Sequence, residues 1–207
     1  MQVRLRAGGA PSDQRGGRPT CNNATVVADE IRGAGEIEIR RLDPTDVEQQ
    51  LDALAGVLAD VVAGGASIGY MAPFSHADAR DAFGTFAAEV AQGRRLLLAG
   101  FLDGVLVGTV QVILAAPPNQ PHRGEITKLL VHRSGRRRGV AQRLMERAER
   151  EALVEGKTLL VLDTADDTAE RLYSRLGWTL VGVIPGFALF PDGRPCATTL
   201  FYKSLEP

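Results

Sequence analysis

One stretch of the sequence joins three patterns that together restrict the fold more than any other feature. Residues 125–131, EITKLLV, have the pattern of an apolar strand, and residues 139–154 have the pattern of an amphipathic helix. Between them lies a basic loop that ends in RRRG at residues 136–139. A helix N-terminus presents free backbone N–H groups and the positive end of the helix dipole, so this junction predicts a site for an anion such as a diphosphate.

The chain from residue 36 onward alternates strand and helix patterns, which indicates a mixed α/β fold. Pro44 and Ser75 stand where helices are expected to begin, and Asp103-Gly104 is a two-residue hairpin signal. Asp167 and Glu170 have capping-box spacing. The predicted order is β-α-α-β-β-β-α-β-α-β-β, with elements near residues 36–42, 44–63, 75–93, 94–102, 105–115, 125–132, 139–154, 157–164, 166–177, 178–184 and 197–205.

Residues 1–35 differ from the remainder because they are rich in Gly, Arg and Asn and have no sustained period. We expect a flexible N-terminal extension there and one domain over residues 36–207. The formal net charge of −1 argues against nucleic acid or an anionic membrane as a partner. No apolar run reaches the roughly 20 residues of a membrane-spanning helix, and no secretory signal is recognised. The 2 cysteines, Cys21 and Cys196, are expected to be free thiols in a cytoplasmic protein.

Two motifs carry a resemblance to a known family. Arg136, Gly139 and Ala141 have the spacing R-x-x-G-x-A, and the segment from Ala169 to Trp178 matches A-x-x-L-Y-x-x-x-G-[FW]. At these positions the sequence resembles the GNAT N-acetyltransferases, over roughly residues 36–205. A closer resemblance, to acetyltransferases like the tabtoxin-resistance protein, rests on HRGEITKLLV, LLVLDT and IPGFALFPDGRP. The resemblance implies a central, mostly antiparallel sheet of six to seven strands flanked by about four helices, and transfer of an acetyl group from acetyl-CoA to an amine.

The resemblance also implies roles for individual residues. Glu125 stands at the position of a general base, and Tyr173 at that of a tyrosine that protonates the departing CoA thiolate. Asp166 stands where an asparagine often contacts the cofactor, and Arg133 where proline is common. The family pattern assigns the pantetheine arm to Leu129, Leu130 and Val131, and the pyrophosphate to Arg136, Arg137, Arg138, Gly139, Val140, Ala141 and Gln142.

Each of these candidates also has a purely structural interpretation. Glu125 is alternatively a surface charge paired with Arg123, and Tyr173 a helix residue that packs on the core. The arginine cluster is alternatively a solvated charge run, although the low net charge and the lack of interleaved aromatic residues argue against a nucleic-acid patch. The three histidines show no metal-ligand spacing, so no metal is expected, and His122 remains a second candidate base.

The acceptor is the least constrained part of the prediction. The loop between the first two helices is expected to overhang the acceptor side, where Tyr70, Phe74 and Phe187 either line a pocket or pack the loop onto the domain. A small-molecule amine is the first choice of acceptor, and a protein N-terminus or lysine is the alternative. A catalytically silent acyl-CoA-binding sensor remains a rival of another class, and a homodimer stays open. Direct transfer is expected because neither cysteine lies in the cofactor region.

Overall fold

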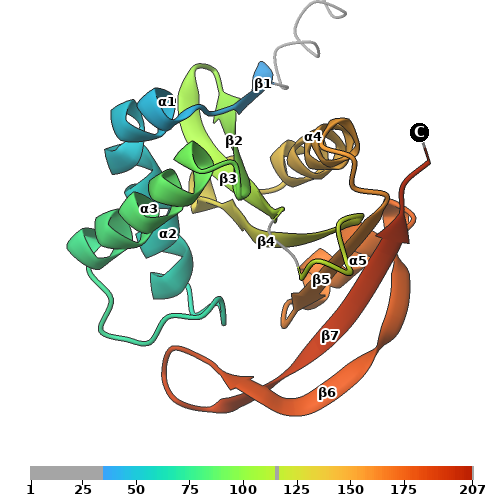
Figure 1. Cartoon of the computed structure of the whole chain (residues 1–207). Coiled ribbons are helices and arrows are strands. Elements are labelled where there is room, and N and C mark those ends of the chain that lie inside the picture. The colour runs from blue at the N-terminus through green and yellow to red at the C-terminus, as the bar shows by residue number, and fades with distance from the viewer. Residues whose placement is uncertain (1–34, 115–116, 207) are drawn as a thin grey trace, which may run out of the picture. The chain divides into compact units, whose positions relative to one another are not determined.

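The structure is a computed structural model that describes residues 35–114 and 117–206. The predicted N-terminal extension, with Cys21, lies outside these residues. In the described part the chain forms a seven-stranded sheet with helices on both faces (Figure 1). In chain order the elements are β1 (Ile37–Arg41), α1 (Pro44–Gln49), α2 (Leu51–Ala63), α3 (His76–Ala91), β2 (Arg95–Leu102), β3 (Val105–Ile113), β4 (Arg123–Val131), the 3-10 helix η2 (Arg133–Gly135), α4 (Val140–Val154), β5 (Leu159–Thr164), α5 (Asp167–Arg175), β6 (Thr179–Leu189) and β7 (Pro195–Ser204).

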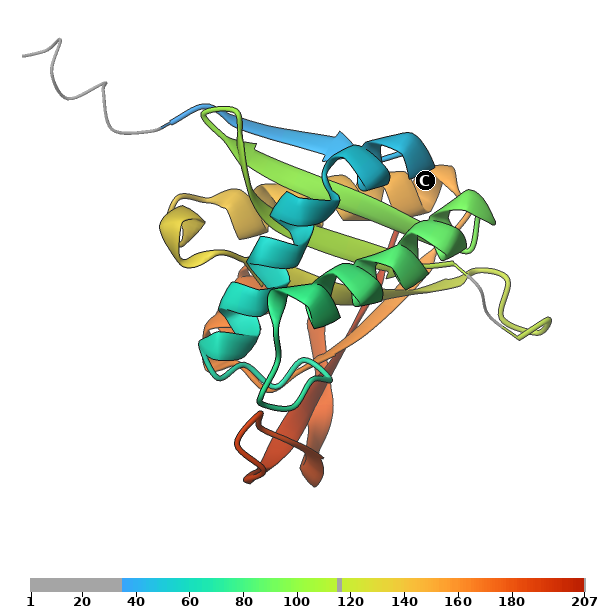
Figure 2. The ribbon, with the colours of Figure 1, turned by 90° about the vertical axis from the view of Figure 1, so that its left-hand side faces the viewer.

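The strand order in the sheet is β1-β2-β3-β4-β5-β7-β6. Only β4 and β5 pair in parallel, and every other neighbouring pair is antiparallel. The predicted mixed fold with a mostly antiparallel sheet is therefore confirmed. One buried cluster joins α4 and α5 to the sheet, and a second joins α1, α2 and α3 to it. Figure 2 shows α2 and α3 crossing in front of the sheet while α4 lies behind it.

Glycines on the central strands let α4 approach the sheet closely. A Cβ atom on Gly100 would lie 2.9 Å from Val140 Cγ1, and one on Gly108 would lie 3.2 Å from the same atom. Both distances are shorter than ordinary van der Waals contact, so larger residues would push the helix away. The first turn of α4 is thereby fixed against β2 and β3, at the junction that the sequence predicts to bind an anion.

The predicted local signals have mixed outcomes. Ser75 caps α3 in a capping box with Asp78, and Asp103 and Gly104 form the β2–β3 turn with φ angles of 51° and 79°. The Asp167–Glu170 capping box is wrong, because the N-cap of α5 is Asp166, whose carboxylate accepts from the backbone N–H groups of Thr168 and Ala169.

The single helix predicted over residues 44–63 is also wrong, since the chain breaks at Gln50 into α1 and α2. No residue at the break forbids a helix. Val47 of α1 and Leu54 of α2 are both fully buried in the same cluster. Because residues seven positions apart share a face of a continuous helix as well, their burial does not require the break.

Candidate active site

Strands β4 and β5 separate part-way along the sheet. They pair only at residues 123–125 with residues 159–161, after which β5 continues beside β7 and β4 beside β3. The edge of β4 that faces β5 is thus left without strand partners from Ile126 to Val131. An extended ligand with amide groups can hydrogen-bond such an edge. Leu129, Leu130 and Val131, the residues predicted to bind pantetheine, lie in this stretch.

A β-bulge interrupts β4 at the same place. Thr127 pairs with Gln111 and Leu130 with Thr109, so β4 carries one residue more than β3 in this interval. Lys128 takes up the difference with a φ of 52°, which is unusual for a residue other than glycine. The bulge redirects the Lys128 side chain, which reaches the loop between α2 and α3 and donates from Nζ to the Ile68 carbonyl at 2.8 Å.

The loop after β4 ends in a helix start without a side-chain cap. Arg137 and Gly139 have left-handed backbone conformations, with φ angles of 60° and 85°. Gly139 is the N-cap of α4 and has no side chain to accept from the first turn, and the bond from Arg143 N to Gly139 O is 3.2 Å long. The backbone N–H groups of Val140, Ala141 and Gln142 precede that bond and are free for an anion. The assignment of the pyrophosphate to this loop stays a prediction.

Two arginines near this loop have partners within the protein. Arg133 donates from its backbone N–H to Asp60 Oδ2 at 3.0 Å, and its guanidinium forms an ion pair with the same carboxylate. Arg136 donates from Nε to the Val131 carbonyl at 3.2 Å. Arg137 and Arg138 are exposed and form no ion pair among the described residues. Arg133 is therefore a structural contact, and Arg137 and Arg138 are the arginines best placed to meet a phosphate group.

Asp60 on α2 holds the loop in place, a role that the sequence does not reveal. Its side chain is 8% exposed, and His132 Nε2 also lies 3.6 Å from its carboxylate. Burial alone would raise the pKa of Asp60, but the hydrogen bonds from Arg133 and the charges of His132 and Arg133 outweigh it and lower that pKa. Asp60 is 73 residues from Arg133 in the chain, so no local pattern indicates the contact.

Glu125 lies on the face of the sheet that carries α2 and α3. Its neighbours Gly124 and Ile126 face α4, and residues alternate between faces along a strand. The Glu125 side chain is half-buried, and within residues 35–114 and 117–206 its carboxylate has no ion pair or hydrogen bond. The alternative in which Glu125 pairs with Arg123 is thus not what the structure shows.

His122, the second candidate base, makes backbone contacts, since its carbonyl accepts from the backbone N–H groups of Thr158 and Leu159.

Tyr173 lies on the opposite face, in the cluster that contains α4. It is 5% exposed, and its ring packs against Trp178 and Phe201 with centroid distances of 6.0 and 5.7 Å. Burial raises the pKa of the Tyr173 hydroxyl, and the charges of Asp166 and Asp163 raise it further. Tyr173 therefore stays protonated at physiological pH. The ring of Tyr173 thus packs in the core, as the structural interpretation expects, and its role as a proton donor stays a prediction.

Asp166 uses its side chain inside the protein. Its Oδ1 atom accepts from Thr168 N at 2.6 Å and from Ala169 N at 3.3 Å, which caps α5. These bonds leave its second carboxylate oxygen for any contact with a cofactor.

The loop between α2 and α3 covers the Glu125 face and is tied to the β6–β7 hairpin. Ser67 Oγ donates to the Leu189 carbonyl at 2.7 Å, and Ala72 N donates to the Pro191 carbonyl at 3.0 Å. Tyr70 and Phe74 are half-buried, with ring centroids 4.6 Å apart. Both rings pack against the α2–α3 cluster, while Tyr70 also faces Lys128, whose Nζ lies 5.4 Å from its ring centroid.

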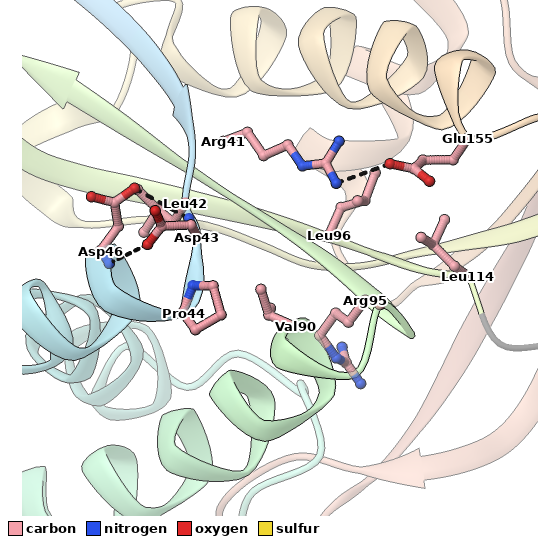
Figure 3. A pocket seen from close by; sticks show the side chains of 11 residues that line it. Arg41, Leu42, Asp43, Pro44, Asp46, Val90, Arg95, Leu96, Leu114 and Glu155 are labelled. Atoms are coloured by element: carbon pink, nitrogen blue, oxygen red, sulfur yellow. Dashed lines mark hydrogen bonds and ion pairs between the residues drawn. The ribbon is translucent and has the colours of Figure 1, made fainter.

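A cavity of about 340 Å³ lies elsewhere, near the ends of α3 and α4. Figure 3 shows Arg41 and Glu155 on one side of it and Pro44 and Val90 on another. Arg41 pairs with Glu155 at 2.9 Å and with Glu151 at 3.2 Å. None of the predicted site residues lines this cavity, so it does not mark the site. The gap between β4 and β5 is the better guide, because the free strand edge and the uncapped helix both border it.

Comparison with known proteins now decides the family. The sequence profile of the acetyltransferase (GNAT) family matches residues 66–178, which is more than half of the chain. The chain belongs to this family. It is an acyltransferase, and the matched region contains every residue predicted to contact the cofactor. The closer resemblance to tabtoxin-resistance proteins stays a prediction.

Solved structures of GNAT enzymes share the fold. An acetyltransferase from Salmonella typhimurium, solved with its cofactor acetyl-CoA, is 20% identical with a TM-score of 0.68, over 82% of this chain and 94% of that one. A ribosomal-protein-alanine N-acetyltransferase from Brucella melitensis is 19% identical with a TM-score of 0.67, over 81% and 99%. An aminoglycoside 6'-acetyltransferase type Ii is 21% identical with a TM-score of 0.60, over 82% and 98%. At such identities these structures establish the fold and leave the acceptor open.

Two kinds of feature are absent from the described residues. No group of His, Cys, Asp and Glu there has the arrangement of a metal site. None of the helices in this part of the chain has both the length and the apolar character needed to cross a membrane.

Proposed function

We propose that the protein transfers an acetyl group from acetyl-CoA to a primary amine of a small molecule, without a covalent acyl-enzyme. The observation that carries this proposal is the free edge of β4 beside the uncapped start of α4. A pantetheine amide would bond the backbone of Leu129, Leu130 and Val131. The pyrophosphate would accept from the N–H groups of Val140, Ala141 and Gln142, with Arg137 and Arg138 beside it.

In this mechanism Glu125 acts as the base and Tyr173 as the proton donor. An alkylammonium must lose a proton before its nitrogen can attack, and Glu125, directly or through water, accepts it. The nitrogen then bonds to the thioester carbonyl carbon, the carbon–sulfur bond breaks, and the nitrogen loses a second proton to water to leave the neutral amide. The Tyr173 hydroxyl gives its proton to the departing thiolate and recovers one from solvent. The placement of the two residues on opposite faces, with the β4–β5 gap between them, supports this division of roles.

A small acceptor is favoured over a segment of a folded protein. The loop over residues 64–75 packs on the face of the sheet that carries Glu125, and the bonds of Ser67 and Ala72 tie it to the β6–β7 hairpin. Cys196 contributes to the same contact, since its thiol donates to Ser67 Oγ at 3.2 Å. A covered face restricts access more for a protein side chain on a large body than for a free amine.

We further infer that two copies of the chain pair through β6. This strand is at the edge of the sheet and has no charged residue over Thr179–Leu189. Its apolar side chains are exposed on both faces, among them Val181 at 61%, Val183 at 58% and Phe187 at 55%. Uncovered edge strands usually carry charges that prevent association. Antiparallel pairing of two β6 strands over Thr179–Ile184, before Pro185, would give these edges partners with twofold symmetry.

Sedimentation of the wild type and of Val183→Lys tests this pairing. We expect a dimer for the wild type and a monomer for the variant, in which two like charges would approach each other. A wild type that sediments as a monomer at tens of micromolar would overturn it.

We also propose that the enzyme acts in the cytoplasm, where acetyl-CoA is made, with neither nucleic acid nor membrane as a partner.

Release of free thiol from acetyl-CoA across a panel of amines tests the main proposal. Turnover with small amines, and none with peptides, supports it. Turnover with peptides alone would favour the protein N-terminus or lysine as the acceptor. Tight binding of acetyl-CoA without turnover of any amine would favour the silent sensor.

A further inference from the structure

Lys128 is a half-buried cation without a carboxylate partner. Its ammonium donates to the Ile68 carbonyl at 2.8 Å and lies 5.4 Å from the Tyr70 ring centroid. Within the described part of the chain no carboxylate lies within 4.0 Å of it. Burial lowers the pKa of Lys128, and the charge of Arg95 lowers it further, while the charge of Asp163 opposes both. A buried charge is costly unless something compensates it, so a ligand anion would be favoured here.

Arg95 belongs to the same cluster. It is 8% exposed, it pairs with Glu89 at 2.6 Å, and its guanidinium lies 4.7 Å from the Phe86 ring centroid. Its charge acts on both Lys128 and Tyr70, lowering the pKa of the former and opposing the increase that burial causes in the latter. Because Glu89 already compensates Arg95, Lys128 supplies the uncompensated charge.

Gln111 adds two hydrogen-bond donors that have no acceptor. The residue is fully buried, and its Oε1 atom accepts from Arg95 Nη1 at 2.5 Å. Its Nε2 atom has no partner among residues 35–114 and 117–206. Gln111 pairs with Thr127, the neighbour of Lys128. The Gln111 amide and the Lys128 ammonium therefore lie on the face of the sheet that carries Glu125. A buried amide that the protein leaves unsatisfied is rare and indicates a missing acceptor.

We propose that Lys128 and Gln111 bind a carboxylate of the acceptor, so that the substrate is an amino acid or an amino-acid-like amine. One carboxylate oxygen would accept from the Lys128 ammonium and the other from Gln111 Nε2. A singly charged anion suits a site with one uncompensated cation, whereas a phosphate dianion would need more positive charge. The inference rests on the proposed acetyl transfer and names the acceptor class of that same site.

Acceptors that differ only in the carboxylate provide the test. Amino acids and their carboxamides are compared by thiol release from acetyl-CoA. The wild type should prefer the acid by about 10²-fold in kcat/KM, the discrimination expected from charge-assisted hydrogen bonds in a buried site. The ratio of kcat/KM for the acid to kcat/KM for the carboxamide should fall to near 1 in Lys128→Met. In Gln111→Leu the same ratio should fall by about tenfold. Lys128→Arg should retain part of the preference.

Lys157 offers a matched control. It is more deeply buried than Lys128, at 9% exposed, and it also donates to a backbone carbonyl, that of Pro121, at 2.7 Å. Lys157→Met should leave the acid-to-carboxamide ratio at the wild-type value. Lys128 is only a structural contact if Lys128→Met changes the rates for acid and carboxamide by one common factor and lowers the Tm as Lys157→Met does.

The outcomes separate the subsite from the proposed function. Equal rates for acids and carboxamides in the wild type would overturn the subsite while acetyl transfer stands. If no amine is acetylated, acetyl transfer fails, and calorimetry with N-acetyl amino acids then decides about the subsite. Binding that Lys128→Met abolishes supports it. If the wild type does not bind N-acetyl amino acids, the carboxylate subsite is overturned.

Discussion

Replacement of Gly139 by glutamate should weaken binding of acetyl-CoA while the fold survives. Gly139 has a φ of 85° and is exposed, and the nearest atom to an added Cβ is Ile37 Cδ1 at 3.8 Å. No steric clash is therefore introduced. The cost to folding is the left-handed conformation of a residue with a side chain, about 1–2 kcal/mol. A domain of ordinary stability, about 5–15 kcal/mol, tolerates this loss.

The effect on binding should be larger than the effect on folding. The new carboxylate would stand beside the pyrophosphate at the uncapped N-terminus of α4. Two like charges about 4 Å apart repel by about 1 kcal/mol in water and about 4 kcal/mol near a protein surface. The exposed loop lies between these limits, so we expect the Kd for acetyl-CoA to rise about 10²-fold. Titration calorimetry of folded Gly139→Glu measures this change.

Two variants separate charge from backbone strain. Gly139→Ala has the same left-handed strain without the charge and should raise the Kd by less than about fivefold. Gly156→Glu places the same charge on another glycine of positive φ, 75°, with open space around it, beyond the far end of the 15-residue helix α4. It should leave the Kd unchanged. An unchanged affinity in folded Gly139→Glu would refute the assignment of this loop to the pyrophosphate.

Four further predictions concern individual residues and the N-terminal segment. Glu125→Gln should lower turnover by about 10²–10⁴-fold with little change in acetyl-CoA affinity, and should weaken the acidic limb of the pH–rate profile; full rate with the same limb would make water or His122 the base. Tyr173→Phe should slow transfer more than it weakens binding, as single-turnover kinetics would show. Asp60→Asn should cost about 1–3 kcal/mol in the free energy of unfolding above about pH 4. Because the folded-state pKa of Asp60 is lowered, the wild type loses this contribution as the pH falls through that pKa, and the variant has none to lose. A chain that begins at Glu36 should keep the full activity, and a loss in a folded truncation would show that residues 1–35 reach the site.

The features that the sequence predicts correctly are those that a local pattern encodes. The junction at Gly139 needs only a strand, a glycine and an amphipathic helix in succession. The hairpin at Asp103-Gly104 and the cap at Ser75 depend on residues at most three positions apart. Such signals act within one turn, so they are readable without knowledge of the packing.

The features that the sequence does not predict depend on contacts between distant segments. Asp60 holds the loop after β4 through Arg133, which is 73 residues away in the chain. The break at Gln50 has no local signal, since no residue there forbids a helix. The sequence pattern gives no sign that Lys128 differs from the other residues of its strand. Only the register between β3 and β4 reveals the bulge that directs its side chain toward Ile68. The strand–loop–helix junction at Gly139 is thus more predictable than the surroundings of Lys128.

The central claim is that this GNAT protein acetylates a small amine directly from acetyl-CoA. The most direct measurement follows free thiol and acetylated amine together, by mass spectrometry, across a panel of small amines. The account predicts that both products appear in equal amounts with at least one amine, and that no acetylated protein intermediate accumulates. Saturable binding of acetyl-CoA without any acetylated amine would contradict it.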